Sequence, residues 1–205
     1  MAERRAAQAG VQHATPIPGS RLAREPWFWP ALITLTAVAL YARTVGFGWV
    51  YDDHMEIVGN VFVRSLSYLP RMFSSTAWAG SGMETYLYRP LPLATFALNY
   101  QVSALDPWSY HLVNVLLHTG VSLLVFRLGL LWGLPAAAAG MGGLLFAVHP
   151  VHVEVVAGVF GRKDLLAALF LLLMALGHRA ALDRGGWRMA LPALAYAAAL
   201  LSKEV

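Results

Sequence analysis

The stretch WFWPALITLTAVALYARTVG, residues 27–46, decides the fold. It is about 20 residues long and carries one charged side chain, Arg43, so as a helix it is long enough to cross the hydrocarbon core of a bilayer. Apolar residues dominate it without the alternation of a β-strand, which indicates a helix rather than a barrel strand. The stretch therefore predicts a first transmembrane helix.

The composition of the whole chain also indicates an integral membrane protein. Of the 205 residues, 58% are hydrophobic and 13% are charged, and the mean hydropathy is +0.56. A soluble domain of this length could not cover so much apolar surface with so few charges. The net charge of +4 does not predict a nucleic-acid partner, because the basic residues stand at the ends of apolar segments, where membrane topology explains them. The absence of cysteine excludes disulfides, thiolate catalysis and cysteine metal sites.

Four further apolar segments follow, at residues 110–131, 135–148, 165–178 and 189–201. The last three are shorter than the roughly 20 residues that a span needs, so we expect their ends to extend into flanking polar residues. Residues 91–104 suit a helix lying at the membrane interface. The predicted fold class is all-α, a polytopic membrane helical bundle with about five transmembrane segments plus this interfacial helix in the first outer loop.

Arginine and lysine placement predicts the orientation. Four arginines precede the first segment, and further basic residues lie near the ends of the second and fourth segments. If all of these face the cytoplasm, the first segment runs outward and the following ones alternate. We expect residues 1–25 to form a disordered cytoplasmic tail and residues 26–205 to form the membrane domain.

This topology collects the conspicuous polar residues on the outer face. The candidate site residues are Asp52 and Asp53 after the first segment, Tyr88 and Arg89 in the first outer loop, His149, His152 and Glu154 after the third segment, Arg162 and Lys163 before the fourth, and Lys203 after the fifth. Cations retained on that face suggest a phosphate ligand, although contact with lipid headgroups is an alternative for each. An aspartate within reach of a hydroxyl can act as a general base, and the alternative is a hydrated helix end.

The motif HPVHVE, residues 149–154, leaves three interpretations open. Two histidines with a nearby glutamate can ligate zinc, but Pro150 breaks the helix that would align them and no familiar metalloprotease motif is present. Polar residues closing a helix end, or a turn that lines the substrate site, are the others. We assign no metal ligands and no certain cofactor.

Five motifs in one order resemble a known family: YDDHMEIVGN (51–60), YRPLPLATFALNY (88–100), DPWSYHLVNVLLH (106–118), FAVHPVHVEVVAGVFGRKDLLAALF (146–170) and ALLSKEV (199–205). They are similar to the membrane domain of the transmembrane and tetratricopeptide-repeat-containing protein O-mannosyltransferases and their prokaryotic relatives, over roughly residues 27–205. The resemblance implies a GT-C-type glycosyltransferase fold whose active site opens to the periplasmic, extracellular or lumenal side.

The resemblance also implies partners and roles. A polyprenyl-phosphate-linked sugar would be the donor, a protein serine or threonine hydroxyl the acceptor, membrane lipids the surroundings, and Asp52 or Asp53 the base. Family motifs cover Tyr88, Arg89, His149, His152, Glu154 and Arg162, whereas the phosphate roles of Arg89, Arg162, Lys163 and Lys203 rest on their charge. Family members carry helical repeats of 34 residues and this sequence shows none, so we expect it to be the N-terminal membrane part of a longer chain.

Two other functions stay open at this point. A proton-coupled transporter or channel could use His111, His118 and Arg127 as a relay. The third possibility is a membrane scaffold fragment without catalysis.

Overall fold

The structure, a computed structural model, describes residues 25–182 and 185–204. The predicted cytoplasmic tail, apart from Glu25, lies outside the described residues. The structure is 77% helical and the described part contains no β-strand, which confirms the all-α prediction. All five predicted apolar segments are helical.

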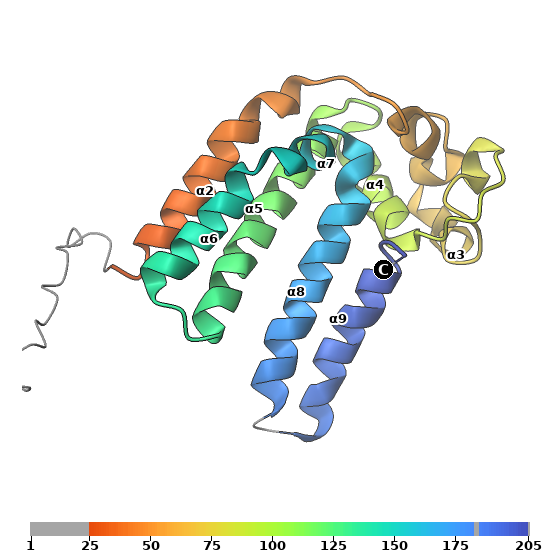
Figure 1. Ribbon diagram of the computed structural model, residues 1–205. Helices are drawn as coiled ribbons and strands as arrows, with labels where there is room; N and C mark the ends of the chain where they lie inside the picture. Colours follow the sequence, from red (N-terminus) through yellow and green to blue (C-terminus); the bar gives the residue numbers. More distant parts are fainter. Residues whose placement is uncertain (1–24, 183–184, 205) are drawn as a thin grey trace, which may run out of the picture.

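Five helices form the bundle in Figure 1: α2 (Phe28–Tyr41), α5 (Trp108–Leu131), α6 (Ala136–Val148), α8 (Arg162–Leu182) and α9 (Ala190–Leu200). Helix α5 packs against α2, α6 and α8, and α9 packs against α8. Helix α8 starts three residues before the predicted segment, so Arg162 and Lys163 lie in its first turn rather than in the preceding loop.

Three helical segments are long and apolar enough to cross a membrane: Phe28–Gly46, Trp108–Leu131 and Val159–Leu182. A fourth is present if Ala136–Val148 and Pro150–Ala157, which meet at a bend of 45°, count as one span. Pro150 begins the 3₁₀ turn η7 (Pro150–His152) at this bend, where its missing N–H ends the helical hydrogen-bond ladder. Helix α9 has 11 residues, about 16 Å, which is short against a hydrocarbon core of about 30 Å.

Small residues explain how closely α2 and α6 approach each other. A Cβ atom added to Gly143 would lie 2.7 Å from Cδ1 of Ile33, and one added to Gly140 would lie 2.1 Å from the ring of Trp29. Ile33 is fully buried at this contact. Glycines at an interface between apolar helices let the backbones pack closely, as in membrane proteins.

The segment between α2 and α5 folds over one end of the bundle. It contains η3 (His54–Val58), η4 (Val61–Arg64), η5 (Leu66–Tyr68), α3 (Leu69–Met72), η6 (Ala79–Ser81) and α4 (Pro90–Ser103). Helix α4 is the predicted helix of residues 91–104. Pro90 and Pro92 stand in its first turn, where the missing N–H groups cost no intrahelical hydrogen bond.

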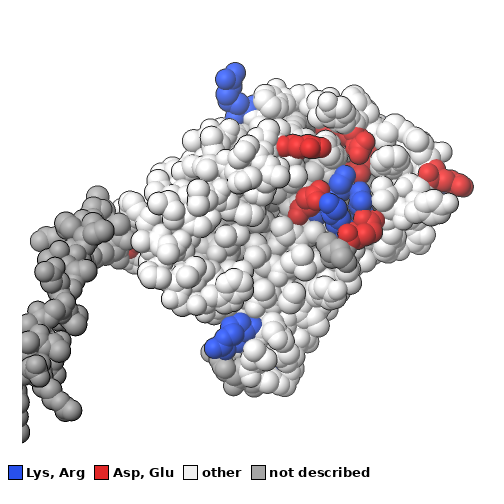
Figure 2. Space-filling view, in the orientation of Figure 1, with Lys and Arg blue, Asp and Glu red and all other residues white. Residues whose placement is uncertain are grey.

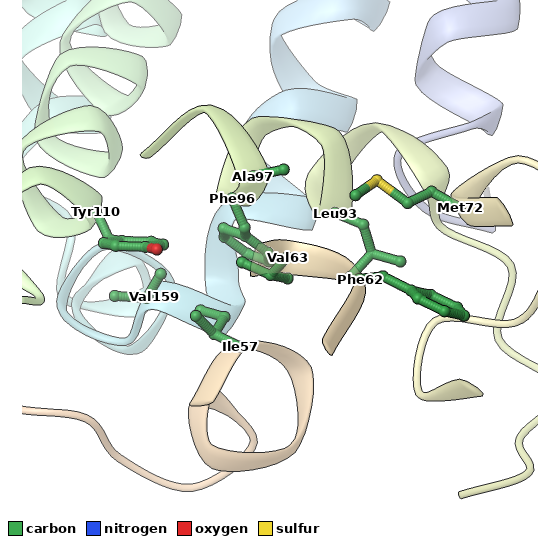
Figure 3. Close-up of a cluster of buried hydrophobic side chains, with 9 residues drawn as sticks. All are labelled: Ile57, Phe62, Val63, Met72, Leu93, Phe96, Ala97, Tyr110 and Val159. Carbon is green, nitrogen blue, oxygen red and sulfur yellow. The ribbon is translucent and has the colours of Figure 1, made fainter. Parts of the chain in front are cut away.

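A buried apolar cluster fixes this segment to the bundle (Figure 3). Its members are Ile57, Phe62, Val63, Met72, Leu93, Phe96, Ala97, Tyr110 and Val159. They come from η3, η4, α3, α4, α5 and η8 (Val159–Gly161), so the cluster joins the segment between α2 and α5 to the starts of α5 and α8. Burying each large apolar side chain contributes roughly 1.5–3 kcal/mol. The turn that carries the acidic residues is thereby held against the bundle.

Candidate active site

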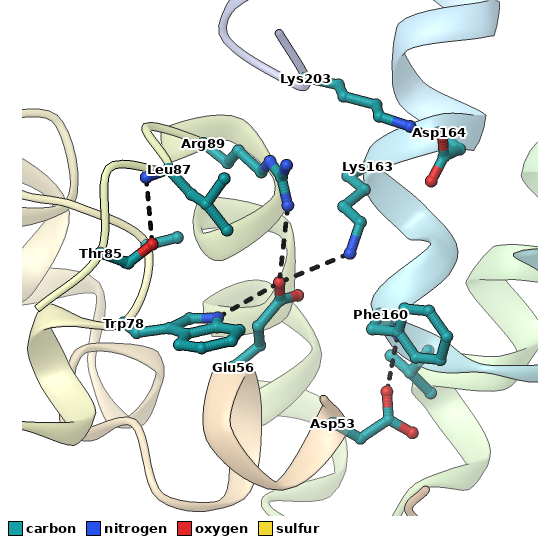
Figure 4. Close-up of polar contacts among 12 residues, drawn as sticks. Asp53, Glu56, Trp78, Thr85, Leu87, Arg89, Phe160, Lys163, Asp164 and Lys203 are labelled. Carbon is teal, nitrogen blue, oxygen red and sulfur yellow. Dashed lines mark hydrogen bonds and ion pairs between the residues drawn. The ribbon is translucent and has the colours of Figure 1, made fainter. Parts of the chain in front are cut away.

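Charged side chains gather at one end of the bundle. Figure 2 shows acidic and basic groups in a patch near the start of α8 and the end of α9, whereas most of the rest of the displayed face carries no charge. Figure 4 shows that the patch includes residues from η3, the loop before α4, the first turn of α8 and the end of α9. Four separated parts of the chain therefore contribute charged groups to one place.

Asp53 is fully buried and both of its carboxylate oxygens are occupied. Oδ2 accepts a hydrogen bond from the backbone N–H of Val50 at 3.0 Å, and Oδ1 accepts one from the N–H of Phe160 at 2.7 Å. Burial raises the pKa of the Asp53 carboxyl, and these backbone bonds oppose the rise. The side chain thus joins the turn before η3 to η8.

Asp52 has different surroundings. It is half-buried, and its carboxylate makes no hydrogen bond or ion pair with the described residues. Its backbone carbonyl accepts a hydrogen bond from the N–H of Glu56 at 2.8 Å, which places the two residues one helical turn apart. Two neighbouring acids therefore have different environments, one tied to backbone amides and one open.

Glu56 is a third acid, which the sequence analysis missed. It is 3% exposed, and its Oε1 atom lies 3.4 Å from Nε1 of Trp78, 3.7 Å from Nζ of Lys163 and 4.0 Å from Nη1 of Arg89 (Figure 4). Burial raises the pKa of Glu56, whereas the Lys163 cation lowers it. In the sequence, its position four residues after Asp52 was only a weak indication that Glu56 belongs to the site. The residues that contact Glu56 come from distant parts of the chain.

Arg89 makes a forked ion pair with Glu204. Its Nε and Nη2 atoms donate to Oε2 of Glu204 at 3.0 and 2.8 Å, and the backbone N–H of Tyr88 donates to Oε1 at 3.3 Å. Burial opposes ionisation of Glu204, but the hydrogen bonds from Arg89 outweigh it and hold the pKa of this carboxyl below its usual value. Lys203 pairs with Asp164 beside it. The residues after α9 are thus attached to both α4 and α8.

Tyr88 supports the loop that carries Arg89. Its hydroxyl donates to the carbonyl of Phe73 at 2.8 Å, and its side chain is partly exposed. Within the described residues, the Tyr88 side chain makes no hydrogen bond to an acid of the patch.

Arg162 occupies the interior rather than the patch. Its guanidinium is fully buried and donates to Asn114 at 2.9 Å, Thr95 at 3.2 Å, Asn99 at 2.5 Å and the carbonyl of Tyr110 at 2.7 Å. It also lies 4.6 Å from the centre of the Phe96 ring. The donors of Arg162 are engaged inside the protein, where a buried charge requires such partners, so this geometry does not favour the phosphate role expected for Arg162, which stays a prediction.

The histidine motif lies apart from the ion pairs. His149 Nδ1 accepts a hydrogen bond from the N–H of Val151 at 3.2 Å, and the His152 ring lies 4.2 Å from the Phe146 ring. Glu154 is exposed and lines a cavity of about 510 Å³ beside Tyr51. In residues 25–182 and 185–204, no three His, Asp or Glu side chains are grouped so that they could hold a metal ion. The hydrogen bond from the Val151 N–H to His149 supports the interpretation of a polar helix end.

Curated proteins similar to this chain share one name. The chain is 38% identical over 171 residues to protein O-mannosyl-transferase TMTC4 of Homo sapiens, which covers 75% of this chain and 23% of that protein. It is 38% identical over 144 residues to TMTC3 of Homo sapiens and 41% identical over 152 residues to Tmtc2 of Drosophila melanogaster, in both cases 69% of this chain and 16% of the relative. The chain therefore spans less than a quarter of the length of these relatives. No family model and no solved structure matches it.

Proposed function

Because the chain belongs to the TMTC protein O-mannosyl-transferase family over the part that it shares with its relatives, we propose that it contributes to a membrane glycosyltransferase that modifies proteins. The proposed donor is a sugar, mannose as in the relatives' names, carried on a polyprenyl phosphate, and the proposed acceptor is a serine or threonine hydroxyl. The observation that carries the proposal is that Arg89 and Lys163 meet at the Glu56 carboxylate, one helical turn after the open Asp52, at one end of an apolar bundle.

The cations suit a phosphate group. Arg89 and Lys163 have side chains only 10% and 12% exposed, so their positive charges lie where water screens them weakly. A phosphate that leaves in a reaction accumulates negative charge, and prearranged cations in a water-poor site stabilise this charge best. A lipid-linked donor would bring its phosphate to the end of the bundle while its chain stays in the bilayer. We propose that this end faces the periplasm, the cell exterior or the lumen.

We assign the general base to Asp52 rather than Asp53. Both oxygens of Asp53 accept backbone hydrogen bonds, whereas the carboxylate of Asp52 is open. In the proposed step, Asp52 accepts the proton of the acceptor hydroxyl and the hydroxyl oxygen forms a bond to the anomeric carbon. The bond from that carbon to the phosphate oxygen breaks, and the phosphate leaves with the electron pair. Arg89 and Lys163 hold the resulting charge.

The other candidates take supporting roles in this proposal. Lys203 is partly exposed and approaches the patch through Asp164, so it is a further contact for phosphate or lipid headgroups. Tyr88 and Arg162 hold the loop and the helices that carry the cations. His149, His152 and Glu154 lie outside the proposed reaction and close the end of α6.

Reconstituted sugar transfer tests the proposal. The membrane-inserted protein is supplied with polyprenyl-phosphate mannose and an unmodified protein acceptor, and transferred sugar is measured. Asp52→Asn is expected to lower transfer by about 10²–10⁴-fold, the usual contribution of a general base. Asp106→Asn, an exposed aspartate outside the patch, serves as the control. Transfer that persists unchanged in Asp52→Asn would refute the assignment of the base.

Within the described residues, no hydrogen bond joins His111, His118 and Arg127, the residues of the alternative proton relay, to one another. His118 Nε2 lies 3.1 Å from the carbonyl oxygen of Ala147, and Arg127 is exposed on α5. His111 and His118 are separated by about two helical turns, roughly 10 Å along the axis. Proton flux through liposomes that contain the protein, in the absence of any sugar donor, would revive this alternative.

A further inference from the structure

We propose that Glu56 is a positioning residue of the donor site, whose carboxylate holds the Arg89 and Lys163 cations together so that both meet one phosphate. This inference rests on the proposed function for the identity of the ligand. It adds a residue that was not among the predicted site residues, and it assigns that residue a role that differs from those of a base or a phosphate ligand.

The two cations repel each other and need an anion to hold them together. Arg89 precedes α4 and Lys163 lies in the first turn of α8, so no local backbone geometry keeps them together. Two positive charges that contact the same carboxylate repel each other, and this repulsion is stronger where little water surrounds them. One oxygen of Glu56 lies 4.0 Å from Nη1 of the first and 3.7 Å from Nζ of the second. Its negative charge therefore keeps the pair assembled before any phosphate arrives.

Glu56 is itself held in place by its neighbours. Its Oε1 atom accepts a hydrogen bond of 3.4 Å from the Trp78 indole, and the neighbouring Ile57 is buried in the apolar cluster. The turn η3 is π-helical, with the N–H of Gly59 bonded to the carbonyl of His54 at 2.8 Å. Single π turns are rare and occur frequently at functional sites. Glu56 is therefore held rigidly one turn away from Asp52.

The contacts to Glu56 leave hydrogen-bond donors of both cations available. The separations of 3.7 and 4.0 Å are longer than charge-assisted hydrogen bonds, which measure about 2.7–2.9 Å. Glu204, in contrast, occupies Nε and Nη2 of Arg89 directly, and its side chain is 49% exposed. A phosphate can thus take the place of Glu204 on Arg89 while Glu56 keeps its position behind the cations.

The decisive variant is Glu56→Gln, which removes the charge but keeps the size and an oxygen for Trp78. We expect kcat for sugar transfer to fall at least about tenfold. We expect the variant to bind polyprenyl phosphate at least as tightly as the wild type does, because the two cations have lost the anion that compensates their charge. Glu56→Asp keeps the charge but moves it back by one methylene, and should restore part of the loss in kcat. Glu84→Gln removes an exposed acid of the same segment between α2 and α5 and should leave kcat unchanged.

The outcomes separate this inference from the proposed function. A wild-type protein that neither binds polyprenyl phosphate nor transfers sugar would overturn the proposed function and this role with it. An active wild type with unchanged kcat in Glu56→Gln would overturn the role of Glu56 alone. A lower thermal midpoint with parallel loss of binding and kcat, in both Glu56→Gln and Glu56→Asp, would show a purely structural ion pair and also overturn it.

Discussion

Asp52 and Asp53 are neighbours in the sequence, but their carboxylates have different surroundings. In Asp53→Asn, the side chain presents one acceptor oxygen and one NH₂ group to two backbone N–H donors, those of Val50 and Phe160. A buried donor left without an acceptor costs about 1–3 kcal/mol, so we expect the free energy of unfolding to fall by this amount. Asp52→Asn should change it by less than about 0.5 kcal/mol. Denaturant titration in detergent measures both, and equal losses would contradict the distinction.

Glu56 should make stability depend on pH. Because burial raises its pKa above the usual 4.5, the folded protein favours the protonated carboxyl more than the unfolded chain does. Its contribution to stability is therefore fully present below about pH 4.5 and is lost as the pH rises through the raised pKa. The groups that face it are Lys163, Trp78, Arg89 and Asp52.

Thermal midpoints measured between about pH 4 and about pH 8 test this expectation. Glu56→Gln cannot titrate, so its midpoint should fall less over this range than that of the wild type. Asp53, whose pKa is also raised by burial, contributes a decline of the same sign in both proteins. Parallel curves for the two proteins would show that Glu56 ionises equally in the folded and unfolded states.

Arg162 stabilises the packing of three helices, because its guanidinium joins α4, α5 and α8. Lysine keeps the charge but cannot reproduce the planar fork, so Arg162→Lys leaves several buried acceptors without donors. We expect the free energy of unfolding to fall by at least about 3 kcal/mol. Arg89→Gln should instead lower sugar transfer with little loss of stability. A stable and active Arg162→Lys protein would contradict the structural role.

The residues after α9 also affect the proposed site, because Glu204 occupies Nε and Nη2 of Arg89, the donors that the proposed phosphate would need. Glu204→Gln removes the competing charge. The expected result is tighter binding of polyprenyl phosphate, by up to about fivefold, since partly exposed ion pairs contribute roughly 0.2–1 kcal/mol. Binding measured at two salt concentrations checks this expectation. Weaker binding in Glu204→Gln would mean that Glu204 orients Arg89 instead of competing for it.

Long apolar runs made the helices predictable from the sequence, because each run is a property of local composition. The sequence also predicted that Arg89, Lys163 and the acids lie at one end of the bundle, since helix order and positive-inside counts require no side-chain geometry. The interior position of Arg162 was not predictable in this way. It depends on Asn99 and Asn114 facing the start of α8, which no local pattern reveals. Glu56 was missed for the same reason.

The orientation of the whole molecule in the membrane can be tested by cysteine labelling, because the chain contains no cysteine of its own. Glu84 lies before α4, Val151 lies in η7, and Trp187 lies in the connection between α8 and α9; all three are exposed. Figure 1 shows this connection at the opposite end of α8 from α4. Cysteines introduced at positions 84 and 151 should react with a membrane-impermeant reagent from one side of the bilayer, and a cysteine at 187 only from the other.

The distribution of arginines also predicts which end of the bundle faces the cytoplasm. Arg179 and Arg188 flank the connection between α8 and α9, so the positive-inside tendency places position 187 in the cytoplasm and the patch outside. Labelling of intact cells at positions 84 and 151, with labelling at 187 only after permeabilisation, is the expected result. If positions 84 and 151 reacted from opposite sides, the helix order of the bundle would be incompatible with a shared membrane face. The reverse orientation would keep the site intact but place the donor phosphate in the cytoplasm.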